Sequence, residues 1–480
     1  MNSNLFVKQM FHYFPAQIAP AVINLIIIMV LTRSFTIEVY GEYILITTLI
    51  GFFVTVFTQW LIQSILFYRP KYNEDNRKKE FNLHIESIIN KFIIASIILL
   101  LLLIIYNTLF MDVTLYILGV LIILVQSIFT IEQVILQSDL QSKRYAMRIF
   151  SSSILRVVGI VVLTLTTINL ISVLIVIVFS YLLFILPKLK NYMQVKKSKN
   201  ISTEQFLKIM LKYGLPMLGW FLAVSIMNVA DRFLIEYFHG SKAVGLYAGN
   251  YSIISAAFGL VFGPLTIVIH PLLMKVAVNL TEHKQKIEQL ISKFTTIFFI
   301  VGLPIIIFVD KFRQEIAYLF LGEEYVVASD LITIVMVGIF LWNLAMVGHK
   351  GMEIINKTKV MFSFALVSCL TSLLLNVFLI EKYSYLGAAY GNLIAFGLYC
   401  LLVYVYSIKR IKWKWNIKEL ILVGCCSALI FLILDFITIN MEESLTINIL
   451  IIVGTTILAG LLYLSLLLAL IKIKLIDIRF

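Results

Sequence analysis

The sequence predicts an all-α polytopic membrane protein with about 14 transmembrane helices, forming two parallel-repeat six-helix lobes plus two extra C-terminal helices. Of its 480 residues, 61% are hydrophobic and only 14% are charged, and the mean hydropathy is +0.99. A soluble chain of this length needs far more polar surface. Apolar runs of about 20 residues recur along the chain, and each is long enough to cross the hydrocarbon core as a helix. The third observation is an internal repeat, described below.

Hydropathy places fourteen candidate spans in the sequence, and each is predicted to be a helix. The break between the fifth and sixth spans falls around Thr166, Thr167 and Asn169, where polar residues interrupt an otherwise apolar run. The expected spans are 14–33, 43–67, 92–111, 113–133, 149–168, 170–187, 213–237, 243–274, 294–310, 330–349, 360–380, 385–408, 418–437 and 446–471.

The chain contains two similar stretches, Tyr13–Tyr43 and Tyr213–Tyr247, each at the start of a group of spans. Both contain a proline near the start, an arginine further on, and a Gly-x-Tyr sequence at the end. Parallel repeats of this kind are related by an axis along the membrane normal, with a substrate path between them. We therefore expect an N-terminal lobe (1–190), a cytoplasmic basic linker (191–212), a C-terminal lobe (213–410) and two appended spans (411–480).

The net charge of +13 is explained by topology rather than by nucleic-acid binding. If residue 1 is cytoplasmic, the segments on the inner side carry 32 Lys and Arg residues and those on the outer side carry 6. Positive residues collect in cytoplasmic loops. The count predicts an even number of spans with both termini in the cytoplasm.

Several classes of function lack their motifs in this sequence. All four cysteines (Cys369, Cys400, Cys425 and Cys426) lie in apolar spans, and the six histidines form no ligand cluster, so we expect no metal and no cofactor. There is no G-x-x-x-x-G-K-[ST] phosphate-binding loop, which argues against an ATPase. There is no TVGYG-like filter of the kind that potassium channels use.

Arg156 is the strongest candidate for contact with a substrate. It lies eight residues beyond Arg148 within a span, about 12 Å further along a helix. A charged group at this depth suggests a function by default. One hypothesis is that Arg156 faces a hydrated cavity and binds a phosphate; the alternative is a structural ion pair with a carboxylate such as Glu132.

Arg33, Asp231 and Arg232 are expected near the outer ends of spans one and seven. An Asp–Arg pair there can lock a lobe or anchor it at the interface. Alternatively, such pairs break and reform as an outer gate during transport. The prediction for these three residues is therefore a gate or lobe-locking role.

Uncharged polar side chains also occur within the spans that open each lobe. Gln59 and Gln63 share one helical face, as do Gln17 and Asn24, by the i, i+4 and i, i+7 rule. Asn228 lies in span seven. These five residues either line a cavity that binds substrate or form hydrogen bonds between helices.

A series of short motifs follows in order across nearly the whole chain. The motifs are Arg33…Tyr40-Gly41-Glu42-Tyr43, Leu215-Pro216…Asn228…Asp231-Arg232-Phe233, Val244-Gly245-Leu246-Tyr247, Leu321-Gly322-Glu323-Glu324-Tyr325, Asn356-Lys357-Thr358-Lys359, Leu375-Asn376 and Leu386-Gly387-Ala388-Ala389-Tyr390-Gly391. Together they resemble bacterial polysaccharide (O-antigen and capsule repeat-unit) flippases of the multidrug/oligosaccharidyl-lipid/polysaccharide exporter superfamily.

The resemblance implies two six-helix bundles in a V around a central cavity, and a transporter rather than an enzyme. It implies that an undecaprenyl-diphosphate-linked oligosaccharide moves from the inner to the outer leaflet of a bacterial plasma membrane by alternating access. The expected partners are this lipid-linked oligosaccharide, the bilayer, and the polysaccharide polymerase and chain-length machinery. No nucleic acid is expected among them.

Three alternatives stay open. A drug/cation antiporter of the same superfamily should carry acidic residues deep in its lobes, whereas span one has none. A peptidoglycan-precursor flippase should have a more cationic first lobe. A membrane-embedded polysaccharide polymerase should have a large extracytoplasmic loop or an acidic catalytic motif.

Overall fold

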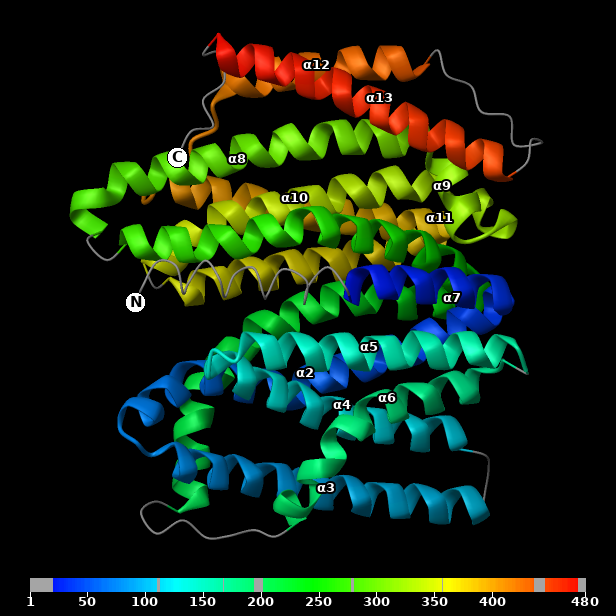
Figure 1. Ribbon diagram of the computed structural model, residues 1–480, viewed down its shortest axis with the longest axis vertical. Coiled ribbons are helices and arrows are strands. Elements are labelled where there is room, and N and C mark those ends of the chain that lie inside the picture. Colours follow the sequence, from blue (N-terminus) through cyan, green and yellow to red (C-terminus); the bar gives the residue numbers. More distant parts are fainter. Residues whose placement is uncertain are drawn as a thin grey trace. The chain divides into compact units, whose positions relative to one another are not determined.

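The computed structural model describes residues 20–109, 113–166, 168–193, 202–277, 280–355, 357–435 and 445–473, and these residues form helices without any strand. Figure 1 shows the helices coloured along the chain. A helix Pro20–Ser34 precedes the labelled elements, which are α2 (Ile37–Glu74), α3 (Lys78–Leu109), α4 (Thr114–Ser138), α5 (Ser142–Thr164), α6 (Leu170–Met193), α7 (Thr203–Val276), α8 (Leu280–Lys311), α9 (Arg313–Phe320), the 3-10 helix η2 (Glu323–Ala328), α10 (Asp330–Ile354), α11 (Thr358–Ile408), α12 (Ile417–Asp435) and α13 (Leu445–Lys472).

Ten of the described helices are long and apolar enough to cross a membrane, so the chain is an all-helical polytopic membrane protein. Two of these ten contain a break in helical geometry, at Gly240 in α7 and at Ser384 in α11. These breaks lie in the gaps predicted between spans seven and eight and between spans eleven and twelve. Gly240 has φ +77°, which glycine adopts without steric cost.

The predicted break between spans five and six is confirmed. Helix α5 ends at Thr164 and α6 begins at Leu170. Asn169 caps α6, because its Oδ1 accepts the Ser172 backbone N–H at 2.8 Å while the Ser172 hydroxyl accepts the Asn169 backbone N–H at 3.1 Å. Side chains that satisfy these otherwise unpaired N–H groups define where a helix begins.

Several helices extend beyond their apolar runs. Helix α7 begins at Thr203, so the second half of the expected linker 191–212 is helical, and α8 begins at Leu280 rather than near 294. Hydropathy measures the apolar layer that a helix crosses, whereas the backbone hydrogen bonds continue through the polar residues at either end.

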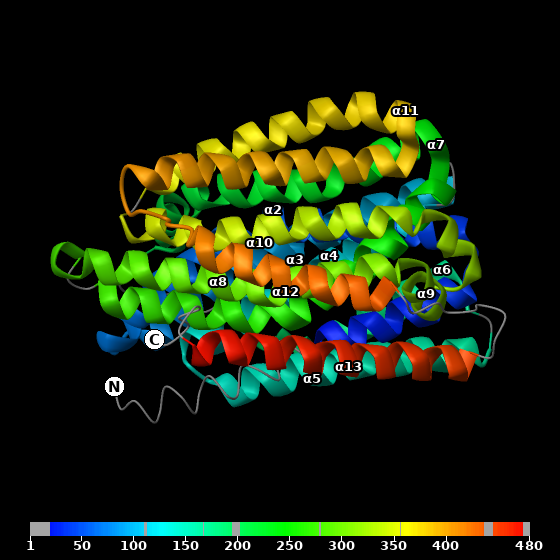
Figure 2. The same ribbon diagram turned by 90° about the horizontal axis from the view of Figure 1, so that it is seen from above.

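The chain divides into two compact units, Met1–Phe233 and Leu234–Phe480, hereafter the first and second unit. In the first unit, α4 contacts each of α2, α3, α5 and α6. In the second unit, α8 contacts α10 and α12, while α12 lies beside α13, as Figure 2 also shows. The boundary between the units falls inside α7.

The start of α7, up to Phe233, belongs to the first unit. The Ser64 hydroxyl of α2 donates a hydrogen bond to the Met210 carbonyl at 2.7 Å. A Cβ at Gly214 would lie 2.1 Å from the Trp60 carbonyl oxygen, so only glycine permits the two backbones to approach this closely. Phe206 and Met210 are fully buried in the same core as α2 and α3.

A buried ionic cluster joins the end of α2, the start of α3 and the end of α4. Arg69 binds Asp139 in a bidentate manner, with Nε–Oδ1 and Nη2–Oδ2 distances of 2.8 and 2.9 Å, and their side chains are 1% and 5% exposed. Asp139 also accepts from Asn73 at 3.0 Å and pairs with Lys78 at 2.8 Å. Arg69 Nη1 donates to Asn82 at 2.8 Å, so all three nitrogens of the Arg69 guanidinium are engaged.

In the second unit, the two halves of α11 pack closely at glycines. A Cβ at Gly387 would lie 2.0 Å from the Leu379 carbonyl oxygen, and one at Gly391 would lie 1.8 Å from Asn376 Oδ1. Small residues four apart allow transmembrane helices to approach closely. The Leu-Gly-Ala-Ala-Tyr-Gly motif is therefore explained by packing.

Replacing Gly387 by alanine should lower the unfolding temperature of the purified protein, measured in detergent. The added methyl group meets backbone atoms that cannot rotate away, and overpacking of this kind costs about 1–3 kcal/mol. Gly424→Ala is the matched control, because a Cβ at Gly424 in α12 has no heavy atom within 4 Å. Equal unfolding temperatures for the two variants would contradict the packing explanation.

Candidate functional site

Arg156 lies on α5 and its side chain is directed at α6. Its guanidinium carbon lies 4.7 Å from the ring centroid of Tyr181, and its Nε donates to the Ser180 hydroxyl at 3.5 Å. The first contact is a cation–π interaction worth about 0.5–2 kcal/mol, and the second is at the limit of hydrogen-bond length. Tyr43 of α2 lies within electrostatic range of both Arg156 and Tyr181.

The predicted alternative of an Arg156–Glu132 ion pair is not formed. Fully buried Glu132 instead pairs with Arg148 at 2.5 Å and with Lys188 at 3.3 Å. It also accepts a hydrogen bond from the Tyr192 hydroxyl. Among the described residues, no carboxylate lies within ion-pairing distance of Arg156.

Arg148 and Arg156 of α5 therefore differ in how their N–H donors are used. Arg148 binds Glu132 and also donates to the Phe184 carbonyl at 2.8 Å. A guanidinium has five N–H donors, and among the described residues Arg156 uses one of them, in a long hydrogen bond. Arg148 thus forms a structural ion pair with Glu132, whereas Arg156 has N–H donors that can bind an anion.

The polar residues predicted to surround a substrate are only partly described. Gln17 lies outside the described residues, and Asn24 is exposed on the helix Pro20–Ser34. Gln59 and Gln63 are half-buried on α2. The Asn228 amide donates to the Val224 carbonyl of its own helix at 2.8 Å. A shared site for these side chains remains a prediction.

Of the residues predicted to form a gate, Arg33 lies next to the end of the helix Pro20–Ser34, whereas Asp231 and Arg232 lie within α7, about two turns before its break at Gly240. Arg33 is exposed, whereas Asp231 is completely buried. Asp231 Oδ1 accepts the Arg232 backbone N–H at 2.8 Å and lies 3.5 Å from Arg232 Nη1. Arg232 Nη1 also donates to the Asn228 carbonyl. These contacts join neighbouring residues of α7, and the role of the Asp–Arg pair as a gate or lock stays a prediction.

Several family-like motifs form a buried polar network in the second unit. The Asn392 amide donates to the Tyr247 hydroxyl at 3.0 Å, and Asn250 donates to the Tyr325 carbonyl at 3.2 Å. Gly322, with φ +116°, allows the turn that places Tyr325. Buried polar groups must be hydrogen-bonded, so these motif residues maintain the fold.

Sequence reasoning missed the partners that define this site. The sequence alone assigns no role in the site to Tyr43, Ser180 or Tyr181. The four-residue interval between Ser180 and Phe184 nevertheless places both of these residues on one face of α6. That face meets Arg156 and Arg148. The sequence pattern that indicates this arrangement is the eight-residue interval between Arg148 and Arg156, which places them on similar sides of α5.

Comparisons with known proteins agree with the helical architecture. Residues 6–277, more than half of the chain, match the model of a family described as "Polysaccharide biosynthesis protein". A protein from Shigella flexneri described as "Putative O-antigen transporter" is 24% identical over 176 residues, which are 36% of this chain and 41% of that protein. The match therefore spans about two fifths of that relative.

Two solved structures share the fold. The lipid II flippase MurJ, in an inward closed conformation, superimposes with a TM-score of 0.76 over 98% of this chain and 99% of that chain, at 16% identity. An inward-facing multidrug resistance MATE transporter superimposes with a TM-score of 0.62 over 83% of this chain and 98% of that chain, at 14% identity. At such identities the likeness concerns the fold alone.

The sequence resemblance is thereby confirmed at the level of the family and of the helical fold. The chain belongs to the polysaccharide biosynthesis protein family.

Proposed function

We propose that this transporter moves an undecaprenyl-diphosphate-linked oligosaccharide from the inner to the outer leaflet of a bacterial plasma membrane, for surface polysaccharide assembly. The observation that carries the proposal is Arg156, an arginine within a span whose donors are largely uncommitted among the described residues. Arginine binds phosphate oxygens in pairs. A diphosphate is the charged group that every such lipid-linked cargo shares.

The proposed cycle uses the architecture expected from the sequence. Fourteen spans form two six-helix lobes and two appended helices, both termini are cytoplasmic, and the lobes alternate between inward and outward access. A hydrated path keeps the sugars and the diphosphate out of the hydrocarbon layer, because each unpaired polar group there costs several kcal/mol. The polyprenyl chain stays in lipid throughout, while Gln17, Asn24, Gln59, Gln63 and Asn228 provide hydrogen bonds to the sugars.

The carboxylates of the first unit argue against the alternative hypothesis of a drug/cation antiporter. Glu132 is bound by Arg148, Lys188 and Tyr192, and Asp231 pairs with Arg232. An acidic group that exchanges cations must release them readily, whereas these carboxylates are engaged by basic side chains. The cationic group at Arg156 instead suits an anionic cargo.

Deleting the gene should abolish surface polysaccharide in the bacterium that encodes it. The lipid-linked repeat unit should then accumulate on the inner leaflet, because its synthesis continues while its transfer stops. Surface polysaccharide is measured by immunoblot, and the lipid-linked unit by mass spectrometry of membrane extracts. Restoring the wild-type gene in trans is the control. Unchanged polysaccharide in the deletion strain would reject the proposal.

A further inference from the structure

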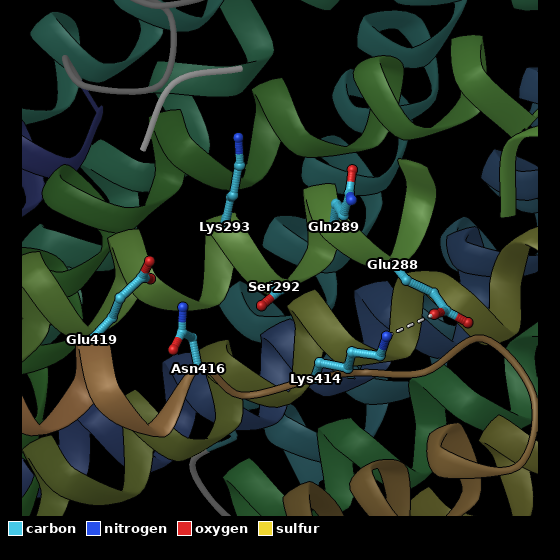
Figure 3. A pocket seen from close by; sticks show the side chains of 7 residues that line it. All are labelled: Glu288, Gln289, Ser292, Lys293, Lys414, Asn416 and Glu419. Atoms are coloured by element: carbon cyan, nitrogen blue, oxygen red, sulfur yellow. Dashed lines mark ion pairs between the residues drawn. The ribbon is translucent and has the colours of Figure 1, made fainter. Parts of the chain in front are cut away.

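A polar cavity of about 370 Å³ lies in the second unit between α8 and the start of α12. Figure 3 shows side chains from α8 and from residues 414–419 around the same space. Four of its lining residues are charged, namely Glu288, Lys293, Lys414 and Glu419. At about 30 Å³ for each water molecule, the volume is sufficient for the headgroup of a lipid.

The two carboxylates of this cavity are held by hydrogen bonds, whereas the side chain of Lys414 is only loosely held. Glu288 and Glu419 are 6% and 8% exposed. Glu288 accepts the Lys412 backbone N–H at 3.0 Å, and Glu419 accepts the Thr296 hydroxyl at 2.9 Å. Lys414, by contrast, is 64% exposed and lies 3.6 Å from Glu288, longer than the 2.7–2.9 Å that is typical of a charged hydrogen bond. Its ammonium can therefore turn to another anion at little cost.

The position of the cavity along the helices corresponds to the membrane interface. The apolar parts of α8 and α12 begin directly after Lys293 and Glu419. Trp413, beside the cavity, is buried and donates its indole N–H to Thr295 at 2.7 Å, and its ring lies 5.5 Å from that of Trp415. Tryptophan is enriched at the level of the lipid headgroups.

The charges of the cavity select among headgroups. Two carboxylates and two ammonium groups sum to zero, so an anionic headgroup would meet buried carboxylates of its own sign. A primary ammonium can donate hydrogen bonds to those carboxylates. A quaternary ammonium has no N–H and is recognised by aromatic cages, whereas all seven residues that line this cavity are polar and none is aromatic.

We propose that this cavity binds the phosphoethanolamine headgroup of a membrane phospholipid. Its ammonium group faces Glu419, and its phosphate contacts Lys293 and Lys414, with Ser292 and Asn416 as further hydrogen-bond partners. The sequence predicts the 409–418 connection to be cytoplasmic, so the lipid belongs to the inner leaflet. This site is independent of the transport proposal, because it uses none of the residues assigned to the cargo.

Native mass spectrometry of the purified full-length protein tests the site. The protein is incubated with an equimolar mixture of phosphatidylethanolamine, phosphatidylcholine and phosphatidylglycerol with identical acyl chains. One phosphatidylethanolamine should be retained in preference to the other two. Lys414→Ala should reduce that retention at least about fivefold, through loss of a charged contact to phosphate. The folded state of each variant is checked by its elution volume and circular dichroism.

Lys359→Ala is the matched control, because it removes the same charge from another exposed position of the second unit and should leave retention unchanged. Soluble glycerophosphoethanolamine should displace the lipid, whereas inorganic phosphate should not. Equal retention of the three lipids, equal behaviour of the two lysine variants, or equal displacement by phosphate would each overturn the proposal.

Discussion

Asp139→Ala should destabilise the first unit by about 3–5 kcal/mol, the usual cost of removing one partner from a buried ion pair. Arg69 would keep its charge while losing two hydrogen bonds of 2.8 and 2.9 Å, and its side chain is only 1% exposed. The unfolding temperature in detergent should fall by many degrees, and expression in membranes should fall with it.

Asp75→Ala provides the matched control. Asp75 follows α2 in the same region and carries the same charge, but it is exposed. Its replacement should change the unfolding temperature little, as for most surface substitutions. A similar loss of stability in both variants would mean that general charge balance, rather than the Arg69–Asp139 pair, stabilises this end of the unit.

The same cluster makes a prediction for acid pH. Burial raises the pKa of Asp139, but hydrogen bonds from Arg69, Lys78 and Asn73 outweigh this and hold the pKa well below its usual range. A carboxylate with a depressed pKa stabilises the folded state fully above its unfolded pKa of about 3.9. That contribution declines as the pH falls below about 4. The gap in unfolding temperature between wild type and Asp139→Asn should therefore be constant near neutrality and narrow in acid.

Arg156→Ala should reduce transport of the lipid-linked oligosaccharide about tenfold or more, with little change in stability. The variant loses charged hydrogen bonds to the diphosphate, which are worth about 1.5–3 kcal/mol, but it leaves no buried carboxylate without a partner. Arg156→Lys should retain part of the activity, because it keeps the charge and loses the paired geometry. The measurement is the rate at which cargo in proteoliposomes becomes accessible to an external glycosidase.

Two other arginines of α5 serve as comparisons. Arg144→Ala should transport normally, because Arg144 is exposed and donates only to nearby Gln141 at 3.1 Å. Arg148→Ala should lose stability, because it removes a partner of fully buried Glu132. Full transport by Arg156→Ala would exclude Arg156 from the substrate path, while a loss of stability in that variant would assign it a structural role.

The helical architecture was predictable because the apolar layer imposes its own length on each span. Even the interruptions were marked, by Asn169 before α6 and by Gly240 within α7. The ends of the helices could not be predicted from hydropathy. The polar first turns of α7 and α8 are helical because of backbone hydrogen bonds, which hydropathy does not register.

Which side chains become partners depends on how each helix is rotated about its axis relative to its neighbours. The sequence of a single helix does not contain this information. Depth alone identified Arg156 as unusual, but Glu132 was as plausible a partner for Arg156 as for Arg148. The packing of α4, α5 and α6 decides between them. Likewise, the Gly387 and Gly391 motif could be recognised as family-like, while its cause became visible only in the contacts within α11.

The placement of Phe206 and Met210 has a consequence for biogenesis. Both side chains complete a core that also contains Phe81 and Ile85 of α3, yet they follow the sixth span in the chain. When the helices up to α6 have been synthesised, this core still lacks two of its residues. The nascent first unit can therefore complete this core only after the start of α7 has been synthesised.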